Sequence, residues 1–302
     1  MKHLSYIRIV KCECMIQAFL TYMQYEKNRS SHTVLSYKTD LLEFQDFISG
    51  RPVQEATVQD VRGWVVSLMS AKVSPRSVNR KLSALRAFYG YLFRKGIVQE
   101  NPMRKISALK TEKKLPTFFR QDSVEAASMP QGDDKTEFAA ARDALIISMF
   151  YETGIRRAEL IGLKAADVNL SSRTIKVLGK GNKERIIPIG EKISEEIDGY
   201  NKIKCKFVGK TEWFFCRDDG KPLYPMMVYR IVHELMARYS TLQKCSPHVL
   251  RHTFATALLN EGANINAVKE LMGHANLAAT QVYTHLTFEQ LQKIYKLAHP
   301  RA

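Results

Sequence analysis

Residues 151–160 read Tyr-Glu-Thr-Gly-Ile-Arg-Arg-Ala-Glu-Leu and carry the strongest indication of fold and function in this 302-residue chain. The glycine is expected to end a helix, and an arginine pair follows it almost at once. Adjacent helical residues point about 100° apart, so only one arginine of the pair can face a common ligand. The glycine spacing favours Arg156 over Arg157.

Further along the chain, reactive residue types follow in a fixed order. Two β-rich runs, residues 174–178 and 184–189, flank a glycine-containing turn that carries Lys180, which predicts a β-hairpin. Downstream, two residues three apart share one helical face, a histidine follows a glycine, and a tyrosine comes nine residues later. These residues are His248, Arg251, His274 and Tyr283.

Such residue types suit the cutting of DNA. A tyrosine can form a covalent link to phosphate that preserves the bond energy, so resealing needs no ATP. Arginine suits the phosphate because its planar fork donates two parallel hydrogen bonds and stays charged. Lysine can protonate the leaving oxygen, and histidine can act as base.

The blocks resemble those of the tyrosine recombinase (phage integrase) family, and most of all its XerC/XerD-type site-specific recombinases. Residues 151–157 resemble the family's Thr-Gly-Leu-Arg box, with isoleucine in place of leucine. Residues 179–185 resemble the Xer hairpin, and residues 248–252 resemble the second arginine box. Residues 271–274 and the segment around Tyr283 complete the set. Single pieces are weak signals, but together they hold six reactive residues in the order of the family, and such a set is very specific.

This resemblance implies the central roles. Tyr283 attacks the scissile phosphate and forms a 3′-phosphotyrosyl link, which leads through a Holliday junction to strand exchange. Arg156 and Arg251 bind the non-bridging oxygens of the phosphate.

The remaining roles follow from the same resemblance. Lys180 protonates the leaving oxygen, His248 accepts the tyrosine proton and His274 donates a further hydrogen bond to the phosphate. Glu159 orients the arginine or the histidine. The reaction is expected to use no metal and no other cofactor.

We expect a mainly α fold with two domains clamped around duplex DNA. A helical SAM-like core-binding domain is predicted over residues 15–106, a linker over 107–117, and an α-rich catalytic domain with a small antiparallel sheet over 118–302. Helices are expected to begin after Ser30 or Ser31, at Thr57, and at Ser74-Pro75. Residues 1–14 are interpreted as an extension, which is either loosely attached or the product of a start site assigned too far upstream.

The net charge is +16, and residues 1–118 carry 20 lysines and arginines against 9 acids. Such an excess favours a polyanionic partner, because each neutralised phosphate releases counterions. Four polar residues near the start of the helix opened by Ser74-Pro75 are predicted to contact DNA, although a solvated basic face would look the same. They are Arg76, Asn79, Arg80 and Lys81.

No apolar run of about 20 residues is present, and the N-terminus lacks a signal-peptide pattern, so a cytoplasmic location is expected. The five cysteines are scattered and are interpreted as free thiols. Cys12-x-Cys14 has no second ligand pair, so it does not indicate zinc.

The expected substrate is a pair of double-stranded recombination sites, held by four protomers. The expected biological role is the resolution of chromosome dimers, which allows chromosome partition at cell division. The resemblance also implies a second Xer-type recombinase and a septal DNA translocase as partners. A mobile-element integrase or DNA invertase with the same chemistry stays open. Many integrases carry an additional arm-binding domain, for which we expect no room in this chain. The alternative of another class is a DNA-binding protein that does not cut.

Overall fold

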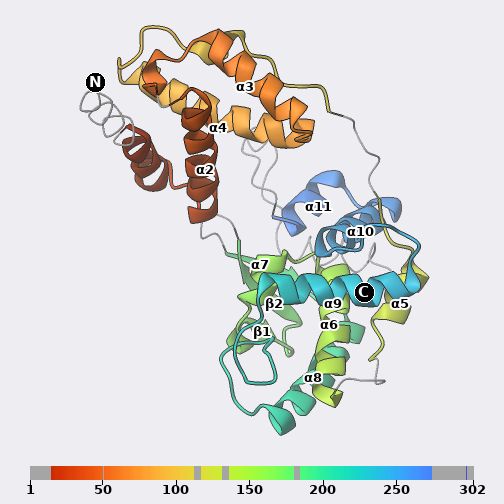
Figure 1. Cartoon of the computed structure of the whole chain (residues 1–302). Coiled ribbons are helices and arrows are strands. Elements are labelled where there is room, and N and C mark those ends of the chain that lie inside the picture. The colour runs from red at the N-terminus through yellow and green to blue at the C-terminus, as the bar shows by residue number, and fades with distance from the viewer. Residues whose placement is uncertain are drawn as a thin grey trace. The chain divides into compact units, whose positions relative to one another are not determined.

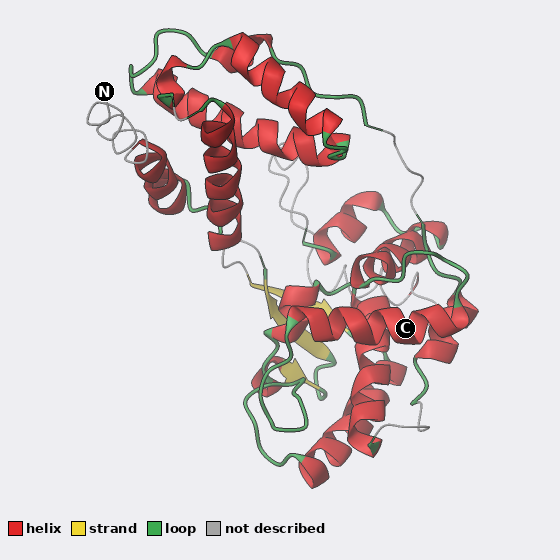
Figure 2. Cartoon of the chain, viewed as in Figure 1, coloured by secondary structure: helices red, strands yellow, loops and turns green. Residues whose placement is uncertain are grey.

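The computed structural model describes residues 15–273, apart from residue 50 and the segments 112–116, 131–135 and 180–183, together with Leu297 (Figure 1). The chain divides into two compact units, Met1–Lys114 and Leu115–Ala302. Most of the described residues are helical, and the strands among them form a three-stranded antiparallel sheet (Figure 2). The predicted mainly helical fold with a small sheet is confirmed.

All the secondary structure described in the first unit is helical. Residues 15–21 are helical and continue into a π-helical turn. The elements that follow the helical start are η1 (Tyr22–Glu26), α2 (Ser31–Phe47), η2 (Val53–Glu55), α3 (Val58–Ser70), α4 (Pro75–Arg94) and η3 (Pro102–Lys105).

The helix starts of this unit are set by local side chains. The Ser30 hydroxyl accepts the backbone N–H of the residue three positions on, and Ser74 does the same. Thr57 and Asp60 form a reciprocal capping box, and Pro75 occupies the first position of α4. The Ser30, Thr57 and Ser74 caps accept N–H groups that have no partner within the helix, whereas Pro75 lacks the N–H group that would otherwise need one. The three predicted helix starts are confirmed.

An aromatic core holds the first unit together. The Phe44 and Trp64 ring centroids lie 5.1 Å apart, and Phe19 meets Phe88 edge-on at 5.3 Å. All four side chains are buried in one hydrophobic cluster. Burying such rings contributes roughly 2–3 kcal/mol each, so packing rather than helix propensity fixes this unit.

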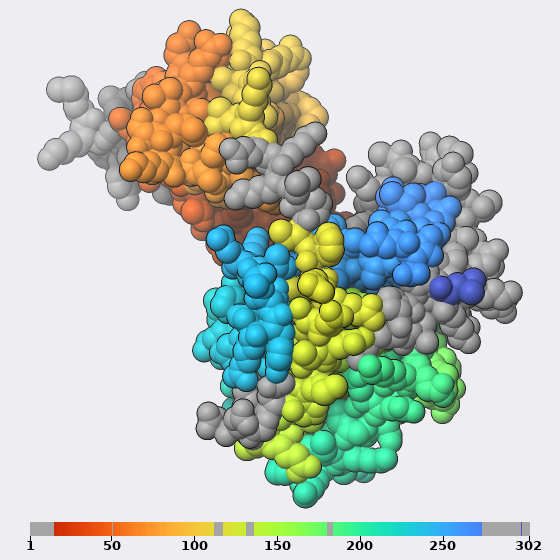
Figure 3. Space-filling view, turned by 90° about the vertical axis from the view of Figure 1, so that its right-hand side faces the viewer, coloured from red at the N-terminus to blue at the C-terminus, as the bar shows by residue number. Residues whose placement is uncertain are grey.

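The second unit is built around α6, a helix that is buried along almost its whole length. It packs against α5, α8, α9 and α10, and α5 lies along α9 on the face seen in Figure 3. The elements of this unit are α5 (Gln121–Ala127), α6 (Glu137–Thr153), α7 (Arg157–Ile161), η4 (Ala165–Asp167), β1 (Val168–Asn169), β2 (Thr174–Leu178), β3 (Glu184–Pro188), α8 (Glu191–Phe207), α9 (Pro225–Tyr239), α10 (Pro247–Asn260) and α11 (Ile265–Leu271).

The predicted hairpin is present as β2 and β3. Ile175 pairs with Ile187 and Val177 with Arg185, in an antiparallel register. The short strand β1, which was not predicted, adds to the free edge of β2. The turn between β2 and β3 lies outside the described residues, so the pairing on its two sides is what the structure establishes about the hairpin.

Within the described ranges, no helix is long and apolar enough to cross a bilayer. The same residues contain no group of three histidine, cysteine, aspartate or glutamate side chains suited to a metal ion. Cys205, Cys216 and Cys245 are free thiols, whereas Cys12 and Cys14 fall outside the described part.

Gly154→Ala is expected to destabilise the second unit by about 2–4 kcal/mol. Gly154 adopts φ +57°, and a Cβ there would lie 2.4 Å from Cδ1 of buried Phe254. Strain and overpacking therefore act together. Urea unfolding measures the loss. Gly199→Ala is the matched control, because Gly199 lies inside α8 and a Cβ there would meet no atom within 4 Å; this change should stabilise by up to about 1 kcal/mol. Equal midpoints for both variants would contradict the prediction.

Candidate active site

The connection between α6 and α7 places Arg156. Gly154 caps α6 in the left-handed conformation, and the chain turns so that Arg156 becomes the N-cap residue of α7. Its side chain is 29% exposed. The sequence pattern around the glycine thus produces a partly open arginine at a helix N-terminus, held by the residues beside it.

Glu159 fixes the position of Arg156 by hydrogen bonds. Its carboxylate accepts the Arg156 backbone N–H at 2.8 Å and the Arg156 Nη1 at 2.7 Å. It also accepts both terminal nitrogens of Arg185, at 2.7 and 2.9 Å. Burial alone would raise the pKa of Glu159, but the hydrogen bonds and charge of Arg185, with the hydrogen bonds of Arg156, lower it to about 2. Glu159 is therefore ionised at every physiological pH.

Arg251 lies on α10 and is buried. Its guanidinium donates to the carbonyl oxygens of Gly154 and Met272. Burial and the nearby charge of Arg156 lower the pKa of Arg251 to about 10, against the opposing effect of Glu159. The group stays protonated at neutral pH, so two positively charged guanidinium groups, from Arg156 and Arg251, belong to one site.

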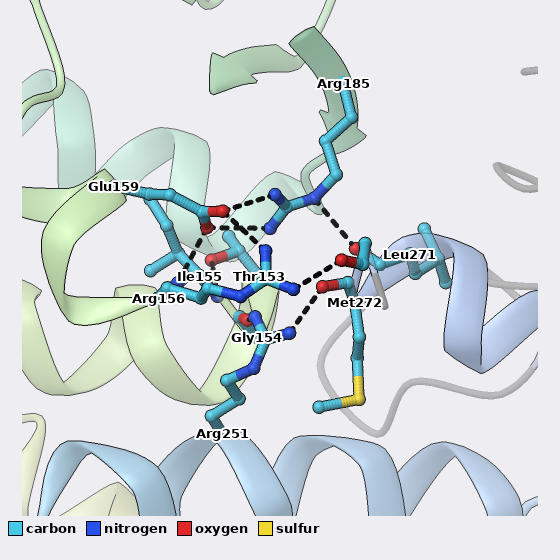
Figure 4. A network of polar contacts seen from close by, with 10 residues as sticks. Thr153, Gly154, Ile155, Arg156, Glu159, Arg185, Arg251, Leu271 and Met272 are labelled. Carbon is cyan, nitrogen blue, oxygen red and sulfur yellow. Dashed lines mark hydrogen bonds and ion pairs between the residues drawn. The ribbon is translucent and has the colours of Figure 1, made fainter. Parts of the chain in front are cut away.

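The end of α11 and the two residues after it contact all three arginines of the site. Three consecutive carbonyl groups there each accept a hydrogen bond from a different arginine (Figure 4). Leu271 O accepts from Arg185 Nε at 3.1 Å, Met272 O from Arg251 and Gly273 O from Arg156. The C-terminal end of a helix carries partial negative charge, which suits contact with cations. The three arginines come from the start of α7, from α10 and from β3, so this turn gathers residues that are far apart in the sequence.

His248 lies three residues before Arg251 on α10, and its side chain is partly open to solvent. Partial burial, followed by the charges of Arg157, Arg251 and Lys244, lowers the pKa of His248 below its ordinary value. The neutral imidazole, which is the form that can accept a proton, is therefore favoured at neutral pH.

The Arg157 side chain donates a hydrogen bond to Pro225 O at 3.4 Å, and no hydrogen bond joins it to Glu159 among the described residues.

Three predicted site residues, Lys180, His274 and Tyr283, lie outside the described residues. The structure brings together Arg156, Glu159 and Arg251. It also adds Arg185, which the sequence reasoning missed. A signal for Arg185 existed, because it alternates in phase with the buried Ile187 of β3, where an apolar residue would be expected.

The predicted DNA contacts of α4 are mostly engaged within the first unit. Arg80 binds Asp40, to which its Nη2 donates at 2.8 Å, and buried Lys81 donates to Glu43 at 2.5 Å and to Asp40 at 3.2 Å. The side chain of Asn79 exchanges two hydrogen bonds with the backbone of residue 109. Arg76 is exposed. A role of these four residues in DNA binding stays a prediction.

Comparison with known proteins gives matches over nearly the whole chain. Residues 121–290 match the model of the phage integrase family, and residues 16–96 match that of the phage integrase N-terminal SAM-like domain. The tyrosine recombinase XerC of Oceanobacillus iheyensis is 39% identical over 298 residues, covering 96% of this chain and 97% of the relative. The XerC of Anoxybacillus flavithermus is 38% identical over 295 residues, covering 95% and 98%.

A solved structure shows the same fold. The XerH site-specific recombinase bound to palindromic difH substrate, in a post-cleavage complex, superposes with a TM-score of 0.70 at 23% identity, covering 88% of this chain and 80% of that one. The family match spans more than half of the chain, and the relatives exceed 30% identity over nearly all of it. The chain therefore belongs to the phage integrase family and is a tyrosine recombinase, an enzyme that exchanges DNA strands.

Proposed function

We propose that this chain is a Xer-type site-specific recombinase that cuts and rejoins duplex DNA through a 3′-phosphotyrosyl link at Tyr283. The observation that supports this most directly is the meeting of Arg156 and Arg251 at one turn of the backbone. Two guanidinium groups that approach from different helices can bind the two non-bridging oxygens of one phosphate. The high identity to XerC relatives supports the Xer-type role.

The proposed reaction divides the work among the residues. Arg156 and Arg251 stabilise the negative charge that builds up on phosphorus as the tyrosine oxygen attacks. His248 accepts the phenolic proton, and Lys180 gives a proton to the departing 5′ oxygen. His274 donates a hydrogen bond to the phosphate. In the reverse direction the 5′-hydroxyl of the partner strand attacks the phosphotyrosine, so the bond energy is retained and no ATP is consumed.

We extend the proposal to the domain organisation. Residues 15–106 form the core-binding domain, 107–117 the linker and 118–302 the catalytic domain, which also takes up His274 and Tyr283. The basic excess of the first 118 residues supports a DNA-gripping role for the core-binding domain. Exchange of two strand pairs requires four nucleophiles, which supports a tetramer on two DNA sites. A second Xer-type recombinase and a septal translocase would be partners, and the chromosomal substrate would place the protein in the cytoplasm.

Covalent trapping on nicked duplex DNA tests the proposal. A nick near the cleavage site lets the short fragment diffuse away, so the protein–DNA link accumulates. Wild-type protein is expected to form a denaturation-resistant adduct in EDTA without ATP, on duplexes that carry the recombination sites of the source genome. Digestion and mass spectrometry should place the nucleotide on the peptide that contains Tyr283.

The other outcomes discriminate between functions. Tight binding without an adduct, in the presence of candidate partner recombinases as well, would favour a DNA-binding protein that does not cut. An adduct on another residue would show that Tyr283 is not the nucleophile. An adduct on transposon ends but not on chromosomal sites would favour a mobile-element integrase.

The pH dependence of cleavage should show the environment of His248. A base works only when it is deprotonated, so the rate should fall as the pH drops through the pKa of His248, and this limb should lie below the ordinary value of 6.5. Arg157→Gln removes one of the charges that lower this pKa, so the acidic limb should move to higher pH. Single-turnover cleavage rates between about pH 5 and 8 measure both profiles. A limb that does not move would contradict the influence of Arg157.

A further inference from the structure

Arg185 links Glu159 to the C-terminal end of α11, and all three of its guanidinium nitrogens already donate hydrogen bonds within the protein. Both of its terminal nitrogens donate to Glu159, and its Nε donates to Leu271 O. Its side chain is 15% exposed, against 29% for Arg156. The three nitrogens of Arg185 are thus engaged, and Arg156 is the more accessible of the two guanidinium groups that Glu159 binds.

Glu159 creates an electrostatic difficulty that Arg185 can resolve. A carboxylate 2.7 Å from Arg156 fixes that side chain but also offsets its positive charge. Among the described groups of the network, Arg156, Arg185 and Arg251 supply three positive charges and Glu159 one negative charge, a net of +2. Without Arg185 the net would be +1.

The chemistry favours the higher value. A phosphodiester carries one negative charge, and attack by a deprotonated tyrosine adds a second at the five-coordinate phosphorus. A net of +2 from the described network, to which the proposed Lys180 and His248 add, stabilises that state more than a net of +1 would, and stabilisation of the transition state is what lowers the barrier.

We propose that Arg185 is a positioning residue of the phosphate clamp, which neutralises Glu159 so that this carboxylate can hold Arg156 without cancelling the charge that Arg156 presents to the scissile phosphate. The inference rests on the proposed function. It acts through Glu159 and Arg156, and needs no contact between Arg185 and DNA.

A charge-rescue experiment tests this role. Single-turnover cleavage of the nicked duplex is measured for wild type, Arg185→Gln, Glu159→Gln and the double variant. Arg185→Gln should lower the rate by roughly 10- to 100-fold, less than the loss of a group that touches the phosphate. Adding Glu159→Gln should recover at least about threefold, because a neutral amide can still accept from Arg156. A merely structural role predicts that the double variant is worse than either single variant.

The same variants are then compared on a duplex with an uncharged methylphosphonate at the scissile position. The ratio of wild-type to Arg185→Gln rates should shrink towards one, because less charge develops there. Arg185→Lys, which keeps the charge but loses the fork, should exceed Arg185→Gln on ordinary phosphate and covers the case in which the glutamine variant folds poorly. The matched control is the exposed pair Arg173–Glu191, joined at 2.8 Å; Arg173→Gln should cleave within about twofold of wild type.

The outcomes separate two failures. If wild type forms no adduct on any of these duplexes, the proposed function is wrong. If wild type cleaves but Arg185→Gln cleaves equally well, or if its defect is the same on both substrates and is not relieved by Glu159→Gln, the role of Arg185 is wrong while the proposed function stands.

Discussion

Tyr283→Phe should form no covalent complex with nicked duplex DNA, while its Kd for the same duplex stays within about twofold of the wild-type value. Phenylalanine keeps the ring but lacks the oxygen that must bond to phosphorus, so the step is lost rather than slowed. The DNA-binding groups are unchanged by the substitution. Denaturing gels measure the adduct, and mobility shifts measure the Kd.

Tyr239→Phe is a matched control for this change. Tyr239 ends α9 and is 36% exposed, so loss of its hydroxyl should leave adduct formation as in wild type. An adduct that survives in Tyr283→Phe would assign the nucleophile elsewhere. A large loss of binding in the same variant would show that the side chain also supports the DNA complex.

Arg251→Gln is expected to lower the single-turnover cleavage rate by about 10³-fold. The substitution removes a charge from the clamp and also leaves the carbonyl oxygens of Gly154 and Met272 without their buried donor. Buried acceptors without partners cost about 1–3 kcal/mol each. We therefore expect the free energy of unfolding to fall by about 2–4 kcal/mol, as measured in urea.

The two effects can be separated with Arg251→Lys. Lysine keeps the positive charge but cannot donate to two carbonyl groups in the fork geometry of arginine. Its stability should lie between those of wild type and Arg251→Gln, with a rate still about 10²-fold below wild type. If Arg251→Gln, folded at the assay temperature, cleaves within about tenfold of wild type, Arg251 does not belong to the clamp.

Local features were predictable from the sequence because their causes are local. Ser30, Thr57 and Ser74 each cap the helix that begins beside them, and the hairpin follows from two β-rich runs around a glycine-containing turn. Gly154 likewise ends α6 through its own backbone conformation. In each case the interacting residues are only a few positions apart, so their spacing in the sequence is enough to predict the interaction.

Contacts between distant segments could not be predicted in this way. Lys81 looks like part of a basic face in the sequence, yet its ammonium group meets acids of α2 that are about forty residues away. The sequence places Arg185 on a strand of the predicted hairpin, but its partner Glu159 lies on another element. A sequence pattern gives the face on which a charge lies, but only the packing of helices decides which charge it meets.

In the turn at residues 271–273, the backbone and the side chains have different roles. The side chains of Leu271 and Met272 are buried in a small apolar cluster with Phe254, whereas the carbonyl groups of the turn hold the arginines. Main-chain contacts do not depend on which side chain a residue carries, so positions 271 and 272 can vary among apolar residues of similar size during evolution. Gly273 differs, because at its φ of +62° a side chain is strained, and an added Cβ would lie 3.2 Å from atoms of Arg185 and push on the arginine network. Mutational tolerance at the site should thus change sharply between two neighbouring residues.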